Sequence, residues 1–230
     1  MSEEVRQMFA DISGEYDFMN TVLTLGMHHG WRRKAVRLSG AAQGMSVLDC
    51  ASGTGDLAIE FKKAVGGKGK VLATDFCVEM LDYIKPKTEK LGLDIPFEFA
   101  DAMNLQYADN TFDIASISYG IRNVDDPVVA LQQMARVVKN NGKIVVIETG
   151  NPTGIMYAGY KLYNNYIVPV LGRMLAGNKD AYTYLPETAS RFPFGNAFIE
   201  LLNKTGMIGT AKAYPLFFGA SYIYVATVRK

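Results

Sequence analysis

Short apolar runs alternate with longer amphipathic segments through the middle of the chain. The apolar runs, each of strand length, lie near residues 45–50, 70–75, 97–100, 112–118 and 143–149. The segments between them that carry apolar positions at helical spacing lie near residues 56–65, 77–91 and 127–138. Strands that alternate with helices in this way form parallel β-α-β units. The pattern therefore predicts an α/β fold with a doubly wound, mostly parallel sheet.

The pattern changes towards the end of the chain. Residues 195–205 have helical spacing, whereas residues 207–214 and 220–228 alternate apolar and polar positions around a turn at 215–219. A helix and a closing antiparallel hairpin are expected there. The chain has 230 residues and 49% hydrophobic content, which suits one sizeable core. We expect a single domain of residues 1–230, divided into an N-terminal helical cap (1–44), a cofactor-binding core (45–150), a substrate lid (151–194) and the closing helix and hairpin (195–230).

A glycine turn follows the first predicted strand. Residues 47–58 read VLDCASGTGDLA, so Gly53 and Gly55 let the backbone turn sharply and pass close to a ligand. The next helix begins near Asp56, where unpaired backbone N–H groups gather. This arrangement predicts a nucleoside-containing cofactor at the carboxyl end of the strand.

Acidic residues end three neighbouring strands and narrow the choice of cofactor. They are Asp49, Asp75 and Asp101, and we expect them to face one crevice. Asp75 lies about 20 residues beyond the glycines, where a carboxylate accepts both ribose hydroxyls, and Asp101 and Ala102 are placed to reach an adenine edge. Asp56 would repel a pyrophosphate. S-adenosylmethionine, which carries ribose, adenine and cationic groups but no phosphate, therefore fits better than a dinucleotide. The alternative is that the acids only cap helices.

Charge and cysteine content exclude several classes of partner. The net charge is +1 and no polybasic run occurs, so no nucleic-acid partner is expected. Cys50 and Cys77 have neither a disulfide framework nor zinc-ligand spacing, and no metal is expected. No secretion signal and no apolar stretch of about 18 residues is present. A cytoplasmic protein, at most peripheral to the inner face of the membrane, is expected.

Two aromatic regions lie outside the predicted core. Residues 16–33 contain the only tryptophan and both histidines, and residues 153–177 place aromatic and aliphatic side chains at helical spacing. The second region is either a helix packed on the core or a lid over the carboxyl edge of the sheet. A lid of this composition would suit an apolar ring or chain.

Several motifs together resemble the menaquinone and ubiquinone biosynthesis C-methyltransferases, which are S-adenosylmethionine-dependent Rossmann-like methyltransferases. The matching segments are 16–20 (YDFMN), 26–31 (GMHHGW), 118–124 (SYGIRNV), 136–142 (RVVKNNG) and 182–188 (YTYLPET). The chain departs from the family pattern at His29, where arginine is usual, and at Gly150, where the family has serine. The resemblance covers nearly the whole chain.

The resemblance implies methyl transfer from S-adenosylmethionine to a ring carbon of a polyprenylated quinol. Demethylmenaquinol is the favoured substrate, and 2-methoxy-6-polyprenyl-1,4-benzoquinol is the alternative. The residues that it implies for cofactor binding are Gly53, Thr54, Asp75, Asp101, Ala102 and Ser118. Transient membrane contact through residues 153–177 is a further hypothesis, and the oligomeric state, a homodimer included, is left open.

The expected catalytic residues follow the fourth strand or lie in the matching segment 26–31. Arg122 and Asn123 are candidates for holding the phenolic oxygen or an activating water, although Arg122 could instead be tied to loop carbonyls. His28 is a candidate base with a pKa near neutrality, or it only fixes the cap. Tyr16 and Asp17 are expected to order the cap over the cofactor.

Glu148 either orients Arg122 or simply ends the fifth strand. Two rival functions remain. The Y-x-x-x-K spacing of residues 157–161 is used by short-chain nicotinamide dehydrogenases, although their glycine loop lies close to the N-terminus. A quinone-binding subunit without catalytic activity is the second rival.

Overall fold

The computed structural model describes residues 3–152, 188–189 and 191–230 of the chain. The predicted lid, residues 151–194, lies almost wholly outside the described residues. So do the aromatic segment 153–177 and the Y-x-x-x-K spacing at 157–161.

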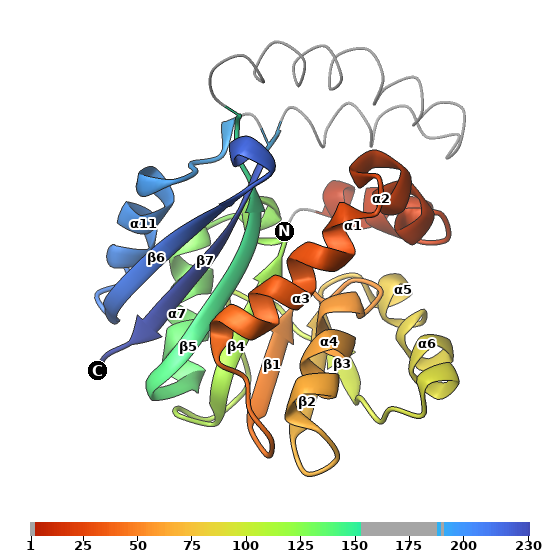
Figure 1. Ribbon diagram of the computed structural model, residues 1–230, viewed down its shortest axis with the longest axis horizontal. Helices are drawn as coiled ribbons and strands as arrows, with labels where there is room; N and C mark the ends of the chain where they lie inside the picture. The colour runs from red at the N-terminus through yellow and green to blue at the C-terminus, as the bar shows by residue number, and fades with distance from the viewer. Residues whose placement is uncertain (1–2, 153–187, 190) are drawn as a thin grey trace.

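The described residues form one seven-stranded sheet with the strand order β3-β2-β1-β4-β5-β7-β6 (Figure 1). The strands are β1 (Ser46–Cys50), β2 (Lys70–Asp75), β3 (Phe97–Phe99), β4 (Phe112–Ser118), β5 (Val138–Thr149), β6 (Ile208–Leu216) and β7 (Ser221–Val228). Strands β1 to β5 pair in parallel, and β7 pairs antiparallel with both β5 and β6. The predicted doubly wound sheet with a closing antiparallel hairpin is confirmed.

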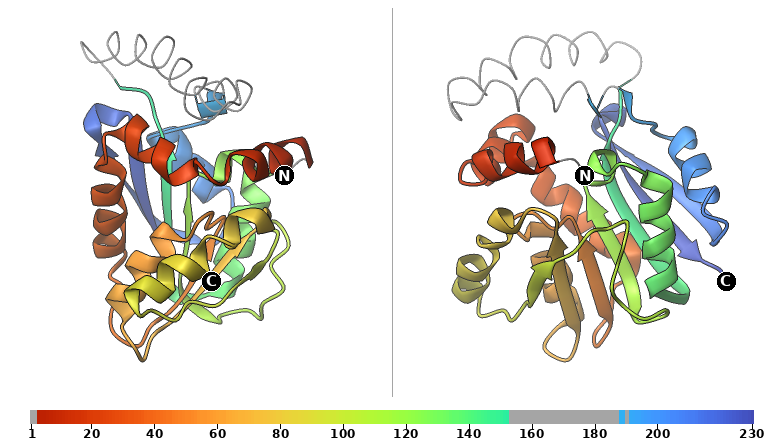
Figure 2. Two further views of the ribbon diagram at one scale, coloured as in Figure 1. Left: turned by 90° about the vertical axis from the view of Figure 1, so that its right-hand side faces the viewer. Right: turned by 180° about the vertical axis from the view of Figure 1, so that it is seen from behind.

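Helices cover both faces of the sheet (Figures 1 and 2). They are α1 (Glu3–Ile12), α2 (Tyr16–Thr24), α3 (Met27–Ser39), α4 (Asp56–Val65), α5 (Val78–Leu81), α6 (Ile84–Leu91), α7 (Pro127–Val137) and α11 (Asn196–Asn203), with short 3-10 turns η1 (Ile121–Asn123) and η3 (Phe217–Gly219). Helices α3, α4 and α6 pack on one face, and α7 and α11 pack on the other. This layering leaves the carboxyl ends of the parallel strands at one edge.

Strand β5 shows why the sheet is covered on both sides. Ile144 and Val146 point into the core beneath α7 and α11, whereas Val145 and Ile147 point into the core beneath α3 and α4. All four side chains are buried. A strand that is apolar on both faces is stable only between two helical layers.

The prediction of one helix over residues 77–91 is wrong, because the structure has two helices, α5 and α6, separated at Asp82 and Tyr83. Pro86 explains the break, since it has no N–H to donate to the carbonyl of Asp82 and its ring crowds that carbonyl. Pro86 lies in the first turn of α6, where a helix needs no such donor.

Strand β5 begins earlier than expected. Its pairing with β4 passes from Val138 opposite Phe112 to Lys143 opposite Ile114. Residues 139–142 therefore leave the ladder between these positions, at the turn that Gly142 and its polar neighbours indicate.

Helices α1 and α2 form a small layer of their own at the carboxyl edge. Ile12 and Met19 are buried between them, and Arg6 of α1 forms an ion pair with Glu79 of α5 at 2.8 Å. Helix α3 is different, because Ala35 and Val36 belong to the main core. Among the described residues, no helix is long and apolar enough to cross a membrane.

Candidate active site

A cleft opens at the carboxyl edge of the sheet. The chain continues from β1 towards β2 on one side and returns as β4 on the other, so the strand order reverses there and a crevice forms. The lining residues are Phe9, Tyr16, Ala51, Gly53, Asp75, Phe76, Cys77, Met80, Ala100, Asp101, Ala102, Ser118, Tyr119, Gly120, Asn123 and Val124. The structure thus brings together five of the six predicted cofactor residues, together with Asn123.

The glycine turn forms one wall of the cleft. Gly53 has φ +55° and Gly55 has φ +84°, both in the left-handed region that favours glycine. A Cβ at Gly55 would also lie 2.8 Å from Cγ1 of Ile84. Any larger residue at Gly55 would therefore displace the loop from α6.

Asp75 connects this turn to β2. Its Oδ2 accepts from the Gly53 N–H at 2.8 Å, and its Oδ1 accepts from the Cys77 N–H at 2.8 Å. Burial raises the pKa of Asp75, although these two backbone donors act to lower it. The carboxylate is held in place, and its remaining lone pairs can accept from ribose hydroxyls.

Polar atoms without partners lie on the opposite side of the cleft. Ser118 Oγ and Asn123 Oδ1 are buried and have no hydrogen-bond partner among the described residues. A buried group without a partner costs about 1–3 kcal/mol, which a polar ligand in the cleft would remove. Asp101 is held by the Met103 N–H at 2.9 Å. This donor and acceptor set fits an adenosine group.

One acid and one threonine differ from the expected arrangement. Asp49 does not line the cleft, so the expectation that three strand-end acids face it is wrong. Its Oδ1 accepts from Ser116 Oγ at 2.5 Å, and burial raises its pKa to about 7. Thr54 does not line the cleft either, because its hydroxyl donates to Asp17 at 2.5 Å and accepts from Lys87 at 2.9 Å.

Arg122 forms a buried ion pair next to the cleft. Its Nη1 donates to Glu148 Oε1 at 2.5 Å, and the same oxygen accepts from the Thr149 N–H at 2.6 Å. Glu148 is fully buried, and both its Oε2 and Arg122 Nε lack partners among the described residues. The contact that would orient Arg122 is therefore present.

Tyr119 is a lining residue that the sequence did not single out. Its φ is +56°, a strained conformation for a bulky residue. Its hydroxyl lies 3.0 Å from Ser221 Oγ, which donates to the Glu148 carbonyl at 2.8 Å. The Arg122 guanidinium lies 5.8 Å from the Tyr119 ring centre. Through these contacts Tyr119 joins β5, β7 and η1 next to the cleft.

His28 lies outside the cleft lining. Its Nδ1 is 2.6 Å from Thr24 Oγ1, and that hydroxyl donates to the Asn20 carbonyl at 2.7 Å. Nδ1 is therefore the donor to Thr24. Burial, with the nearby charges of Arg32 and His29, lowers the pKa of His28 to about 4. The expected pKa near neutrality is wrong, and the contacts favour a role in joining α2 to α3.

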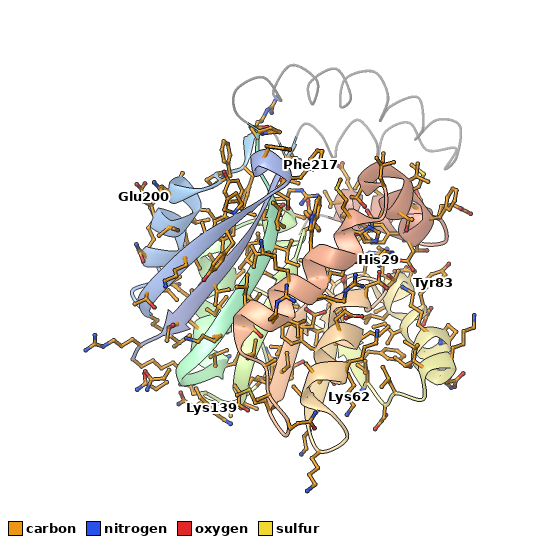
Figure 3. The ribbon with its side chains drawn as sticks, viewed as in Figure 1. His29, Lys62, Tyr83, Lys139, Glu200 and Phe217 are labelled. Atoms are coloured by element: carbon orange, nitrogen blue, oxygen red, sulfur yellow. The ribbon has the colours of Figure 1, made fainter. Side chains whose placement is uncertain are left out.

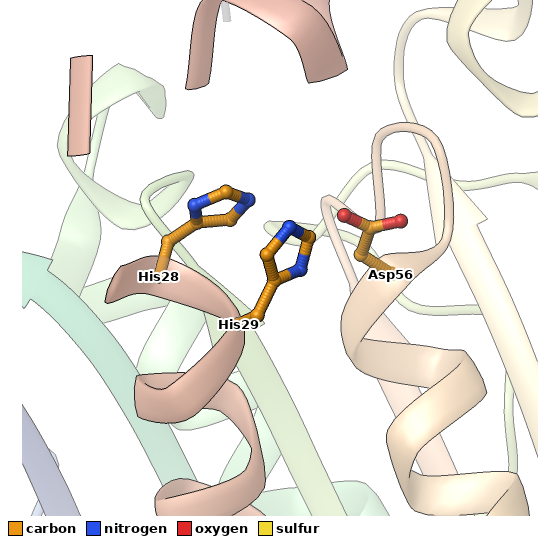
Figure 4. Close-up of side chains that lie close together, drawn as sticks. All are labelled: His28, His29 and Asp56. Atoms are coloured by element: carbon orange, nitrogen blue, oxygen red, sulfur yellow. The ribbon is translucent and has the colours of Figure 1, made fainter. Parts of the chain in front are cut away.

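His28, His29 and Asp56 form a group whose ligand atoms lie within 4.8 Å of one another (Figure 4). Among the described residues this is a geometry that could hold a metal ion. However, Asp56 Oδ2 accepts from Arg32 at 2.6 Å and Asp56 Oδ1 accepts from Lys87 at 2.7 Å. Both carboxylate oxygens already face cations, which would repel a metal ion.

The lowered pKa of His28 predicts a pH-dependent stability. Because the folded pKa of about 4 lies below the ordinary value of 6.5, the unfolded chain takes up the proton first as the pH falls. This contribution is fully present above pH 6.5 and is lost between about pH 6.5 and 4. His28→Asn should remove roughly 1–2 kcal/mol of the stability difference between pH 7 and pH 5 measured by urea unfolding.

The matched control for this measurement is Arg33→Asn, because Arg33 lies on the same helix, α3, and is exposed. It should leave the loss of stability between pH 7 and pH 5 unchanged. An unchanged pH dependence in His28→Asn would show that the low pKa of His28 is incorrect.

The chain is similar to known methyltransferases over nearly its whole length. Residues 1–227 match the model of the ubiE/COQ5 methyltransferase family. The chain is 48% identical to the Bdellovibrio bacteriovorus ubiquinone/menaquinone biosynthesis C-methyltransferase UbiE, covering 99% of this chain and 97% of that protein. It is 37% identical to a Bacillus cereus demethylmenaquinone methyltransferase, covering 97% and 94%.

Solved structures show the same fold at low identity. A Thermotoga maritima protein described as a S-adenosylmethionine-dependent methyltransferase, possible histamine N-methyltransferase, matches with a TM-score of 0.68 and 18% identity, covering 96% of this chain and 98% of that chain. An Aquifex aeolicus S-adenosylmethionine-dependent methyltransferase matches with a TM-score of 0.61 and 20% identity, covering 86% and 89%. These findings exclude the dehydrogenase and non-catalytic alternatives: the chain belongs to the ubiE/COQ5 methyltransferase family and is a methyltransferase whose methyl donor is S-adenosylmethionine.

Proposed function

We propose that this methyltransferase methylates a ring carbon of a polyprenylated hydroquinone and converts demethylmenaquinol to menaquinol. The observation that carries the proposal is the near full-length similarity to a ubiquinone/menaquinone biosynthesis C-methyltransferase, at 48% identity, and to a demethylmenaquinone methyltransferase, at 37% identity. The cleft is compatible with an aromatic substrate, because Phe9, Tyr16 and Tyr119 line it together with polar groups.

S-adenosylmethionine supplies an electrophilic methyl group when it is bound. Gly53, Asp75, Asp101, Ala102 and Ser118 are the proposed contacts, since all five line one cleft at the carboxyl edge. Thr54 acts indirectly in this proposal, because its hydroxyl already bonds to Asp17 and Lys87.

The substrate places a different demand on the site. An aromatic carbon becomes nucleophilic when a neighbouring hydroxyl loses or shares its proton, and the resulting negative charge needs a fixed positive partner. We assign this role to Arg122, which Glu148 holds in a buried ion pair. Asn123 lines the cleft and has a buried Oδ1 that no described residue bonds, so this oxygen can accept from the hydroxyl or from a water molecule.

Methylation of 2-methoxy-6-polyprenyl-1,4-benzoquinol is the second candidate. The relative with 48% identity is named for both ubiquinone and menaquinone biosynthesis. The two rings differ in size and in their substituents, so the shape of the substrate side of the cleft decides between them.

A strongly apolar substrate also favours a cytoplasmic protein that touches the membrane surface. Phe217 and Phe218 in η3, and Leu25 after α2, are exposed at 45%, 66% and 83%. Phe217 lies near the carboxyl end of β5, at the edge that also carries α2 (Figures 1 and 3). These apolar side chains support transient contact with a lipid surface. A homodimer is a separate proposal.

The proposed reaction is tested by mass spectrometry of the lipid products. Purified protein and S-adenosylmethionine are incubated with chemically reduced demethylmenaquinol or with the prenylated methoxy-benzoquinol in separate vessels. One added methyl group on the naphthoquinol is expected. Methylation of the benzoquinol alone would contradict the preferred substrate, and methylation of neither would contradict the proposed reaction.

Arg122→Lys should lower kcat by about 10²-fold, the loss typical of one fixed donor to a developing oxyanion. The charge opposite Glu148 is kept, but the planar guanidinium donors are lost. The KM for S-adenosylmethionine should stay within about threefold, because Arg122 does not line the cofactor cleft.

The control variant is Arg136→Lys, since Arg136 forms an ion pair with Asp109 at 2.7 Å and does not line the cleft. Both variants are checked for folding by thermal unfolding. An Arg122→Lys variant that keeps the wild-type kcat would exclude a role in charge stabilisation.

A further inference from the structure

Lys87, on α6, joins three separate parts of the chain. Its Nζ forms an ion pair with Asp17 of α2, donates to Thr54 Oγ1 at 2.9 Å and donates to Asp56 Oδ1 at 2.7 Å. A lysine ammonium has three protons. Each of them therefore reaches a different element: the N-terminal layer, the glycine turn and the start of α4.

The charges around Lys87 balance within this cluster. Arg32 Nη1 lies 2.6 Å from Asp56 Oδ2, so two cations face two carboxylates. Burial acts to raise the pKa of Asp56, but the charges of Arg32 and Lys87 outweigh it and the pKa is lowered. The side chains of Lys87 and Asp56 are only 25% and 20% exposed, and such pairs are screened less than surface pairs.

The same contacts fasten two walls of the cofactor cleft to each other. Asp17 follows Tyr16, and Thr54 follows Gly53. Both Tyr16 and Gly53 line the cleft, and a Cβ built on Gly53 would lie 3.8 Å from Tyr16 Cε1. Since Thr54 Oγ1 also donates to Asp17 Oδ1 at 2.5 Å, the N-terminal layer and the glycine turn are held together at two adjacent positions.

We propose that Lys87 is a positioning residue for the cofactor. It acts through Asp17 and Thr54 to keep α1 and α2 closed over the glycine turn, and this closure slows the release of S-adenosylmethionine. The inference depends on the cleft being the cofactor site and is independent of which quinol is methylated.

The residue type suits this role. Three acceptors that approach from different elements match the tetrahedral ammonium, whereas the flat guanidinium of arginine directs its donors in one plane. The N-terminal layer has a second attachment, the ion pair of Arg6 with Glu79 at 2.8 Å. Loss of Lys87 should therefore loosen the closure without unfolding the layer.

The test compares Lys87→Met with Lys85→Met in the full-length protein. Lys85 lies on the same helix and is exposed, and its ammonium forms a 4.0 Å ion pair with the exposed Glu89. The dissociation rate of radiolabelled S-adenosylmethionine is measured by rapid filtration. Lys87→Met should release it about tenfold faster, equivalent to about 1.4 kcal/mol. Its kcat at saturating cofactor should stay within twofold of wild type, and Lys85→Met should match wild type in both.

A double-mutant cycle separates this role from a general loss of stability. If Lys87 acts by holding Tyr16, Lys87→Met should have little further effect in a Tyr16→Ala background. Lys87→Arg, which keeps the charge, should recover part of the slow release. Thermal unfolding without cofactor shows whether each variant is folded.

Three results would overturn the inference. The first is a wild-type dissociation rate in a folded Lys87→Met variant. The second is an effect of Lys87→Met that is equally large in the Tyr16→Ala background. The third is wild-type protein that does not bind S-adenosylmethionine, which would overturn the cofactor assignment as well.

Discussion

The hydrogen bond from the Gly53 N–H to Asp75 is the interaction on which the site depends. It joins the turn after β1 to the end of β2, while Cys77 fixes the other carboxylate oxygen. The parallel pairing of Cys50 with Thr74 brings these two strand ends level. A buried carboxylate with a raised pKa is costly to ionise, and cationic or hydroxyl groups of a ligand would favour the ionised form. The Asp75 carboxylate is therefore held in a fixed position, where it can accept hydrogen bonds from a polar ligand.

Two further polar clusters lie next to residues that line the cleft, although their own side chains do not line it. On one side, Lys87 links the N-terminal layer to the glycine turn through Asp17 and Thr54. On the other side, Glu148 holds Arg122 close to the end of β4. The side chains of the first cluster are partly exposed, so its ion pairs are screened more by solvent, whereas the side chains of the second cluster are buried.

Much of the fold was predictable because the apolar pattern has a clear period in each element. The acids at Asp75 and Asp101 were predictable as well, since carboxyl ends of parallel strands meet at one edge. The break between α5 and α6 could have been found from Pro86, whose effect on a helix is local. The environment of Asp49 was harder to predict from the sequence. Its carboxylate accepts a hydrogen bond from the Ser116 hydroxyl, which lies on a different strand.

Contacts between distant segments explain what the sequence did not reveal. In the sequence, Lys87 is one of several lysines on a polar helix. No nearby residue in the sequence indicates that Asp17 or Thr54 would be its partners. Tyr119 was interpreted only as part of a motif, although it lines the cleft and has a strained backbone. The pKa of His28 depends on burial and on charges that folding brings close. Such effects arise from tertiary structure and have no local signal.

The most direct test of the account is a crystal structure of the full-length protein with S-adenosylhomocysteine, the demethylated product of the methyl donor. The account predicts that the ribose hydroxyls bind the Asp75 carboxylate, that the adenine lies against Asp101 and Ala102, and that Ser118 gains a hydrogen bond from the ligand. A ligand bound away from the carboxyl ends of β1, β2 and β4 would contradict the assignment of the cleft.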